Sequence, residues 1–476
     1  MGCTTILVGK NASYDGSTMT ARNDDSPSGI FHVKKLQVIH SSEQPRHYKS
    51  VLSKFEIDLE DNPLQYTSMP NATSEEGVWA AAGVNSENIA MTATETITSN
   101  TRVLSADPLV KDGFGEEDIV VITLPYIHSA KEGVIRLGSL LEKYGTYEMN
   151  GIAFQDVDNI WYLETIGGHH WMARRVPDDS YVMMPNQLGI DSFDFDDAYS
   201  EQKEYMCSSD LKEFVEKYHL DLSMDGNFNP RDAFGSHSDS DHVYNTPRAW
   251  YMGRYFNPNT YDWNNVFTPE SDNLPWCLVP EKKITPSDIK YILSSHYQGT
   301  DYDPYGSHNN SELKGKYRTI GINRNSFVAL IQLRGYMPYE LQAIEWIAEG
   351  SNAFNTMVPF LAHMNEAPEY LANTTSTVST DNFYWANRLI GALSDANYGK
   401  SIVEIERYSQ KIESKGFELI LKYEPLIKEA EDKNKVITEA NNEIACMLKE
   451  ETQNVLSKVL YIASMNMKNG FSRSDN

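Results

Sequence analysis

Two short segments at the start of the chain predict a β-hairpin, and this hairpin constrains the fold more than any other feature of the sequence. Residues 3–10 read CTTILVGK and residues 17–24 read STMTARND; both are strand-like, and Asp15-Gly16 lies in the turn between them. If the strands end near Lys10 and Ser17, the numbers of facing residues sum to about 27, which places Cys3 across from the segment 22–25. The sequence therefore predicts a thiol beside a guanidinium and carboxylates.

The charge balance excludes two classes of partner. Among 476 residues, 41 are Lys or Arg and 67 are Asp or Glu, which gives a formal net charge of −26. A field of this sign repels both nucleic acid phosphates and anionic lipid headgroups, so we expect neither nucleic acid nor membrane as a partner. No run approaches the ~20 apolar residues of a membrane span, and the first residues carry no secretory signal pattern. We expect a cytoplasmic protein.

The rest of the chain alternates strands and helices irregularly, which predicts an α+β fold. We expect a paired β-segment at 78–85 and 89–97, a helix over 132–144, a three-stranded meander within 159–187, a helix starting near 285 and a buried strand at 325–335. The stretch from 191 to 247 is acidic and carries no specific motif. We expect a catalytic domain over 3–380 and a helical region over 381–476, packed on or extending that domain and broken into at least two helices at Pro425.

Cys3 admits two interpretations. In the structural one, a small apolar residue begins a strand, and Arg22 and Asp25 form an ordinary cross-strand ion pair. In the chemical one, removal of Met1 and Gly2 makes Cys3 the first residue, and its new α-amine acts as the general base for its own thiol. The amine titrates near ~8 and the thiol near ~8.5, so proton exchange between them is nearly isoenergetic. Arg22 would then favour the thiolate and Asp25 would hold the ammonium.

The motifs of the chain resemble those of a known group. CTTILVG, DGST and ARNDD are similar to the opening of the N-terminal nucleophile hydrolases of the choloylglycine-hydrolase group, and GGHHWMARRVPDD followed by PNQ resembles its dipeptidase A branch. The likeness extends from residue 3 to about residue 260. It implies an α+β fold of four αββα layers with a helical C-terminal appendage, and it favours the chemical interpretation of Cys3.

The resemblance also implies roles for individual residues. Cys3 matches the nucleophile, and Arg22 and Asp25 match the arginine beside the thiol and the aspartate that binds the terminal amine. Asn186 matches an asparagine of the oxyanion hole, for which an amide NH2 is chemically suited. Arg248 matches a late arginine that supports the nucleophile.

One segment departs from the pattern of the bile-salt and penicillin acylases. Where these enzymes have a second asparagine or a tyrosine, this chain has Ala93, Thr94 and Glu95. The second oxyanion donor is therefore open between Thr94 and a backbone N–H. Glu95 would suit the free ammonium of a dipeptide, which a bile salt lacks.

The pair His169-His170 invites a metal interpretation. Adjacent residues of a strand point to opposite faces, and no third ligand is apparent, so we predict no metal and no cofactor. We expect one of these histidines to pack under the sheet and the other to line the substrate cleft.

The resemblance to the dipeptidase A branch implies a cysteine dipeptidase of broad specificity. We expect dipeptides as substrates, a homo-oligomer, and removal of Gly2 through self-cleavage by Cys3. Two alternatives stay open: an amidase acting on penicillin V or conjugated bile salts, and a non-catalytic surface binding protein on the same scaffold.

Overall fold

The computed structural model describes residues 2–73, 75, 77–307 and 311–469, and the side chains at 94 and 95 lie outside the described part. Within it, the longer strands form two antiparallel sheets. The seven-stranded sheet has the order β14 (Cys277–Leu278), β12 (Tyr181–Met184), β1 (Thr4–Val8), β2 (Thr18–Asp25), β15 (Asn325–Leu333), β16 (Ala343–Glu349) and β17 (Val358–Leu361). The six-stranded sheet has the order β13 (Tyr205–Cys207), β11 (His170–Arg175), β10 (Ile160–Ile166), β9 (Asn150–Gln155), β8 (Ala90–Thr96) and β7 (Ala82–Val84). Two small ribbons pair β3 (Gln37–Ile39) with β6 (Tyr66–Ser68) and β4 (His47–Lys49) with β5 (Glu56–Asp58).

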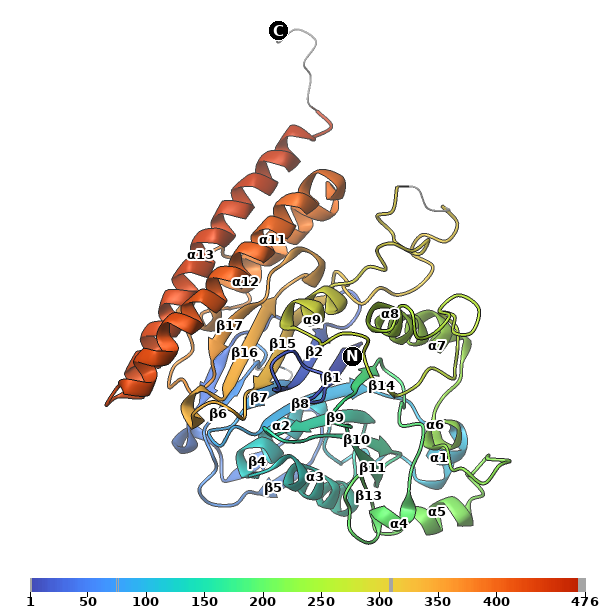
Figure 1. Ribbon diagram of the computed structural model, residues 1–476. Helices are drawn as coiled ribbons and strands as arrows, with labels where there is room; N and C mark the ends of the chain where they lie inside the picture. The colour runs from blue at the N-terminus through green and yellow to red at the C-terminus, as the bar shows by residue number, and fades with distance from the viewer. Residues whose placement is uncertain (1, 74, 76, 308–310, 470–476) are drawn as a thin grey trace, which may run out of the picture.

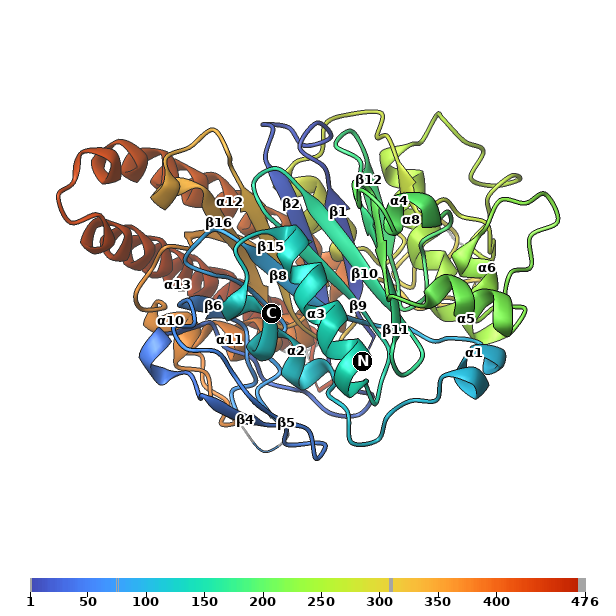
Figure 2. The same cartoon turned by 90° about the horizontal axis from the view of Figure 1, so that it is seen from below.

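Helices cover the outer face of each sheet. Figure 2 shows α2 (Glu116–Thr123) and α3 (Ala130–Tyr144) over the six-stranded sheet. The seven-stranded sheet carries α8 (Thr246–Phe256), α9 (Pro286–Leu293), α11 (Phe383–Asp395), α12 (Tyr398–Glu429) and α13 (Lys433–Met465), and Figure 1 shows α12 and α13 running side by side. The remaining helices are α1 (Thr101–Ala106), α4 (Phe195–Ala198), α5 (Leu211–Lys217), α6 (Pro230–Phe234), α7 (Asp239–Tyr244) and α10 (Glu369–Ala372), with 3₁₀ turns at Ser41–Glu43, Leu124–Tyr126, Tyr339–Leu341 and Asn352–Phe354.

The two sheets stack face to face because their strands are apolar on both sides. In β1, Ile6 and Val8 pack with the helices over the seven-stranded sheet, whereas Leu7 points to the other face. Leu7 shares a buried cluster with Ala153 of β9 and Tyr162 of β10. A strand with apolar side chains on both faces belongs inside a layered structure, and β1 accordingly has the helices on one face and the six-stranded sheet on the other.

The structure confirms the predicted N-terminal hairpin and its register. β1 and β2 pair antiparallel from Thr4 opposite Asn23 to Val8 opposite Met19, so facing residues sum to 27. It also confirms the pairing of β7 with β8 and the expected strand β15. Thr285 caps α9 through a hydrogen bond with the backbone N–H of Asp288, as its helix-start signature predicts.

Two expectations about chain path are wrong. The predicted meander over 159–187 breaks after β11, because β12 crosses to the other sheet and pairs with β1. The segment 177–180 makes this crossing, and its carbonyl groups at Asp178 and Ser180 accept backbone hydrogen bonds from Asn11 and Gly9. The second concerns only the place of a break: the region does contain at least two helices, as predicted, but Pro425 lies inside α12, which continues to Glu429, and the break before α13 follows at Ala430.

The C-terminal helices are part of the same apolar core as the seven-stranded sheet. Buried residues of α12 and α13 cluster with β16 and β17, and Asn441 of α13 exchanges hydrogen bonds with both backbone groups of Leu361 in β17. No described helix is long and apolar enough to cross a membrane.

Candidate active site

The hairpin places Cys3 next to Arg22. Thr5 faces Arg22 across the two strands, and the side chains of Cys3 and Arg22 both point toward the six-stranded sheet. Nη2 of Arg22 donates to the Cys3 sulfur over 3.0 Å. Both residues are fully buried. The predicted contact between a thiol and a guanidinium is therefore present.

Arg22 also binds two buried carboxylates. Its Nη2 lies 3.0 Å from Asp24 and 2.9 Å from Glu116, the first residue of α2. A second cation completes the cluster, since Nζ of the fully buried Lys34 lies 3.6 Å from Asp24. Two cations thus face two carboxylates around one thiol.

Burial and these neighbours act in opposite directions on the charged groups. Burial alone would raise the pKa of Asp24, but Lys34 and Arg22 outweigh it, so the pKa of this carboxyl lies below its usual value. Burial lowers the pKa of Lys34, and Asp24 offsets only part of that shift. Behind Glu116, burial and the charge of Glu116 raise the pKa of Glu148 to about 7.

Backbone carbonyls fix the two cations as well. Nη1 of Arg22 donates to the carbonyls of Ala81 and Ala93, and Lys34 donates to the carbonyl of Trp79 over 3.0 Å. Trp79 and Ala81 have φ angles of 47° and 60°, a region that costs a non-glycine residue roughly 1–3 kcal/mol. The loop before β7 therefore holds strained backbone at the point where it contacts the two cations.

Arg248 joins Asn186 to the backbone of Cys3. From α8, its Nη1 donates to the carbonyl of Cys3 and to the hydroxyl of Thr4, the latter over 2.7 Å. Its Nη2 donates to Oδ1 of Asn186 over 2.8 Å. Because the carbonyl end of the Asn186 amide faces Arg248, its NH2 end faces away from that guanidinium. The structure thus brings Arg248, Asn186 and Cys3 together.

Asp25 lies on the opposite face of β2 from Arg22 and binds other partners. Its carboxylate accepts hydrogen bonds from Arg318 and Asn325. Nη2 of Arg318 also donates to the carbonyl oxygen of Gly2 over 3.0 Å. Arg318 therefore links the carboxylate of Asp25 to the peptide bond between Gly2 and Cys3. It does not pair with Arg22, so the ordinary cross-strand ion pair between Arg22 and Asp25 is absent.

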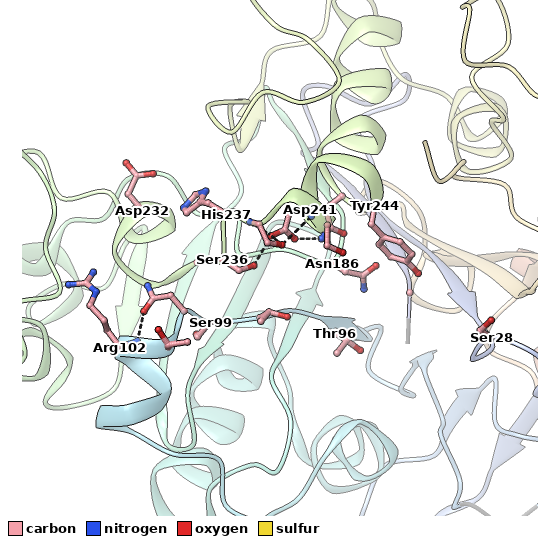
Figure 3. Close-up of a pocket in the computed structure, with 18 of the residues that line it drawn as sticks. Ser28, Thr96, Ser99, Arg102, Asn186, Asp232, Ser236, His237, Asp241 and Tyr244 are labelled. Carbon is pink, nitrogen blue, oxygen red and sulfur yellow. Dashed lines mark hydrogen bonds between the residues drawn. The ribbon is translucent and has the colours of Figure 1, made fainter. Parts of the chain in front are cut away.

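A cavity of about 1150 Å³ opens beside this cluster. Gly2 lines it, whereas the fully buried Cys3 is not among its lining residues. Figure 3 shows Asn186, Asp241 and Tyr244 gathered near one helix, with Thr96 across from them. Much of the wall comes from residues 235–245, inside the acidic stretch in which the sequence showed no motif. Other lining residues are Pro27, Ser28, Thr98, Ser99, Asn100, Thr101, Arg102, Leu222, Asp232 and Arg324.

One group of side chains in the described residues has the spacing of a metal site. Ligand atoms of Cys3, Asp24 and Glu116 all lie within 4.8 Å of one another. Nη2 of Arg22 contacts each of the three, so a guanidinium already supplies the positive charge at their centre. These residues fit a bound guanidinium better than a metal ion, and the absence of a metal stays a prediction.

His169 and His170 do not have the arrangement that the sequence predicted. His169 precedes β11, so strand alternation does not separate the pair, and Nδ1 of each contacts the same carboxylate of Asp107 at 3.0 and 2.8 Å. Burial would raise the pKa of Asp107, but hydrogen bonds from His170 and His169 outweigh it, and the pKa lies well below its usual value. Neither histidine is among the described lining residues of the cavity.

The remaining site predictions fall partly outside the described structure. Thr94 and Glu95 belong to β8, but their side chains lie outside the described residues, so their roles stay predictions. Sequence reasoning placed Asp24 in the segment across from Cys3 but gave it no role of its own. It missed four further residues of the cluster, for which the sequence carried no local signal: Lys34, Glu116, Arg318 and Asn325.

Comparison with known proteins defines the class of this α+β chain with its buried thiol. The model of peptidase family C69 matches residues 2–411, and the chain belongs to this family. It is 53% identical to a probable dipeptidase A of Streptococcus pyogenes serotype M3 over 476 residues, which is 100% of both chains. It is 50% identical to a dipeptidase of Bifidobacterium longum, again over 100% of each chain, and 46% identical to a probable dipeptidase B of Lactococcus lactis over 99% of this chain and 98% of that one.

Proposed function

We propose that the protein is a cysteine dipeptidase in which the thiol of Cys3 is the nucleophile. The contact of 3.0 Å between the Cys3 sulfur and the Arg22 guanidinium carries this proposal, because a cation at that distance favours the reactive thiolate. The relatives named dipeptidase, matched over nearly their whole length, support dipeptides as the substrate class.

The proposed reaction begins once the residues before Cys3 have left. The thiolate attacks the scissile carbonyl of a dipeptide, and the NH2 of Asn186 donates to the developing oxyanion. The freed α-amine of Cys3 gives a proton to the leaving amino group, which leaves the first residue as a thioester on sulfur. Water then hydrolyses the thioester with the same amine as general base.

Asp25 and Arg248 have supporting roles in this proposal. The carboxylate of Asp25 holds the new ammonium of Cys3, near the carbonyl that Arg318 now binds. Arg248 fixes the carbonyl oxygen of Cys3 and the orientation of Asn186 at the same time. Thr94 or a backbone N–H supplies the second oxyanion donor, and Glu95 receives the substrate ammonium.

The arrangement of two stacked sheets between helices supports the four-layer αββα fold of the N-terminal nucleophile hydrolases. Cys3 directly precedes β1, a central strand of one sheet, and faces the other sheet. We assign residues 3–380 to the catalytic domain and 381–476 to a helical region packed on it. The proposed reaction uses no metal or organic cofactor.

Replacement of Cys3 tests the proposal directly. Cys3→Ala and Cys3→Ser are expected to abolish dipeptide hydrolysis and to retain Gly2 in N-terminal sequencing. Cys446→Ala is the matched control, because Cys446 is an exposed thiol far along the sequence, and this variant is expected to keep parental activity. Iodoacetamide labelling of the processed parent should modify Cys3. A folded Cys3→Ala protein that splits dipeptides at the parental rate would refute the mechanism.

A substrate panel separates the proposed function from its rival. Dipeptides, penicillin V and a conjugated bile salt are assayed on the same processed protein. The proposal expects turnover of dipeptides, whereas preferential turnover of the two amides would assign the thiol to an amidase.

A further inference from the structure

Two buried arginines hold the peptide groups on either side of Cys3. Arg248 donates to the carbonyl oxygen of Cys3, and Arg318 donates to the carbonyl oxygen of Gly2 over 3.0 Å. The second contact concerns the bond between Gly2 and Cys3, because a nucleophile that breaks this bond places negative charge on the oxygen of Gly2. The structure therefore shows a cation already positioned where that charge would develop.

The position of Arg318 is fixed by its surroundings. Its side chain is nine-tenths or more buried, and its Cζ lies 5.1 Å from the centre of the Tyr244 ring. Its backbone N–H donates to the carbonyl of Val243 over 3.1 Å, and its Nη1 donates to the carbonyl of Thr319 over 2.9 Å. A donor held in place before the reaction stabilises a transition state without reorganisation.

Burial and neighbouring charges together set the pKa of the Arg318 guanidinium. Burial and the nearby Arg324 lower the pKa of Arg318 to about 9, while Cys3 opposes the shift. The direct counterion of Arg318 is Asp25. A new negative charge at the Gly2 carbonyl would therefore meet a cation that is only partly compensated in a water-poor site.

The space around Gly2 is too small for a larger residue. A side chain at position 2 would collide with the hydroxyl of Tyr244, which accepts a hydrogen bond from Arg324. Gly2 lines the cavity, so the residues that leave have a path to solvent. Because Cys3 itself is fully buried, the removal of Gly2 is what opens the thiol to a substrate.

We propose that Arg318 is a catalytic residue of the self-processing step, in which it stabilises the oxyanion on the Gly2 carbonyl. This inference rests on the proposed function of Cys3 as a nucleophile. The Cys3 sulfur attacks the Gly2 carbonyl carbon, a C–S bond forms, and the C–N bond between Gly2 and Cys3 breaks. The nitrogen takes the thiol proton and becomes the free α-amine, and water then hydrolyses the thioester to release a new carboxylate.

The same geometry assigns Arg318 a different task from Asn186. Oδ1 of Asn186 is held by Arg248, on the side of the Cys3 carbonyl, whereas Arg318 lies on the side of the Gly2 carbonyl. Arg318 therefore acts when the scissile carbonyl belongs to the chain itself, and Asn186 acts when it belongs to a bound dipeptide. After processing, Asp25 exchanges one of its contacts for the new ammonium of Cys3.

Arg318→Met and Arg318→Lys test the role of Arg318 in processing. Intact mass and N-terminal sequencing follow the loss of Gly2 with time in folded protein. Arg318→Met is expected to slow processing by about 10²- to 10³-fold, the usual effect of removing one oxyanion donor, and Arg318→Lys to slow it less. Arg334→Met is the matched control: it also removes a buried arginine paired with a carboxylate, Glu424, and should process at the parental rate.

Deletion of Gly2 separates the role of Arg318 in processing from any role in folding or in dipeptide turnover. When Gly2 is deleted, Met1 directly precedes Cys3, and the cell's methionine aminopeptidase exposes the thiol without self-cleavage. In this background Arg318→Met is expected to hydrolyse dipeptides within about tenfold of the Gly2-deleted parent. A merely structural role for Arg318 would leave the Gly2-deleted variant as inactive as the unprocessed one.

The outcomes distinguish this inference from the function on which it rests. Parental processing of Arg318→Met, together with retained Gly2 in Cys3→Ala, would overturn the role of Arg318 and leave the nucleophile intact. Loss of Gly2 from Cys3→Ala would overturn self-processing itself. An inactive Gly2-deleted Arg318→Met would place Arg318 in the mature enzyme or in the fold and would also overturn the inference.

Discussion

Nη2 of Arg22 lies 3.0 Å from the sulfur of Cys3, and this one nitrogen also contacts Asp24 and Glu116. Arg22 is therefore both the cation beside the thiol and the counterion of two buried carboxylates. A change at this position alters the reactivity of the thiol and the stability of the cluster together, and the two effects are separable by experiment.

Arg22→Lys is expected to lower thiol reactivity more than it lowers stability. Lysine keeps the positive charge but loses the planar fork, so it cannot bind the thiol, both carboxylates and the carbonyl of Ala93 at once. A charge-assisted hydrogen bond is worth about 1.5–3 kcal/mol, which predicts a decrease of roughly 10- to 100-fold in kcat/KM. The rate of iodoacetamide alkylation of the processed protein should fall in parallel.

Arg334→Lys is the control for this substitution, since it changes a buried arginine that lies directly after β15 and pairs with Glu424. Alkylation of Arg22→Lys at the parental rate would show that the guanidinium does not activate the thiol.

Asn186→Ala is expected to reduce kcat by about 10²- to 10³-fold and to leave KM within a small factor. The reason is that the amide NH2 binds the oxyanion more strongly than the ground-state carbonyl. Asn227→Ala is a suitable control, because Asn227 is exposed and donates its hydrogen bonds to the nearby Asp225. An increase in KM at constant kcat would assign Asn186 to ground-state substrate binding.

The hairpin at the active site was predictable because its register depends on local sequence. Once the turn is placed, strand pairing fixes which residues face Cys3. Alternation along β2 then separates Arg22 and Asp24 on one face from Asn23 and Asp25 on the other. The motif alone gave a role to Asp25. The alternation of side chains along β2 instead identifies Asp24 as the carboxylate beside Arg22.

The distant members of the cluster were not predictable in the same way. Glu116, Arg318 and Asn325 reach Arg22 or Asp25 only through the packing of separate elements, and their neighbours in sequence carry no motif. The crossing of β12 to the other sheet escaped prediction for a related reason. A run of extended segments indicates strands, but the periodicity does not say which sheet each strand joins.

His170→Ala is expected to lower the apparent Tm while kcat/KM for dipeptides stays near the parental value. The histidines and their backbone N–H groups supply four hydrogen bonds to Asp107, which ties the turn before β11 to the end of α1. Loss of such a contact costs about 1–3 kcal/mol. His47→Ala, at an exposed histidine, is the control. A large rise in KM for His170→Ala would support the predicted role of this residue in substrate binding.

Asp107→Asn tests the same contact through the pH dependence of stability. Because the pKa of Asp107 is lowered in the folded protein, its contribution to stability is present above the unfolded pKa and is lost as pH falls through the folded value. The Tm difference between the parent and Asp107→Asn should therefore shrink in acid. A difference that stays constant between neutral pH and strong acid would contradict this assignment.

Glu345→Gln is expected to stabilise the protein at pH 8 and to change little near pH 4.5. Burial raises the pKa of Glu345 to about 7, against a usual value of 4.5, and a hydrogen bond from Thr67 offsets only part of this shift. A carboxyl with a raised folded pKa favours folding fully below its unfolded pKa, and this advantage is lost as pH rises through about 7. The shift corresponds to about 3 kcal/mol between pH 4.5 and pH 8.

Glutamine keeps the acceptor for Thr67 and has no charge to bury, so the variant should lack this loss of stability. Differential scanning calorimetry of the parent and Glu345→Gln at both pH values gives the comparison. Glu366→Gln, at an exposed carboxyl, should shift the Tm little at either pH. Equal Tm values for the parent and Glu345→Gln at pH 8 would mean that the native protein accommodates the ionised carboxylate without penalty, through water or rearrangement at Oε2, which has no hydrogen-bond partner among the described residues.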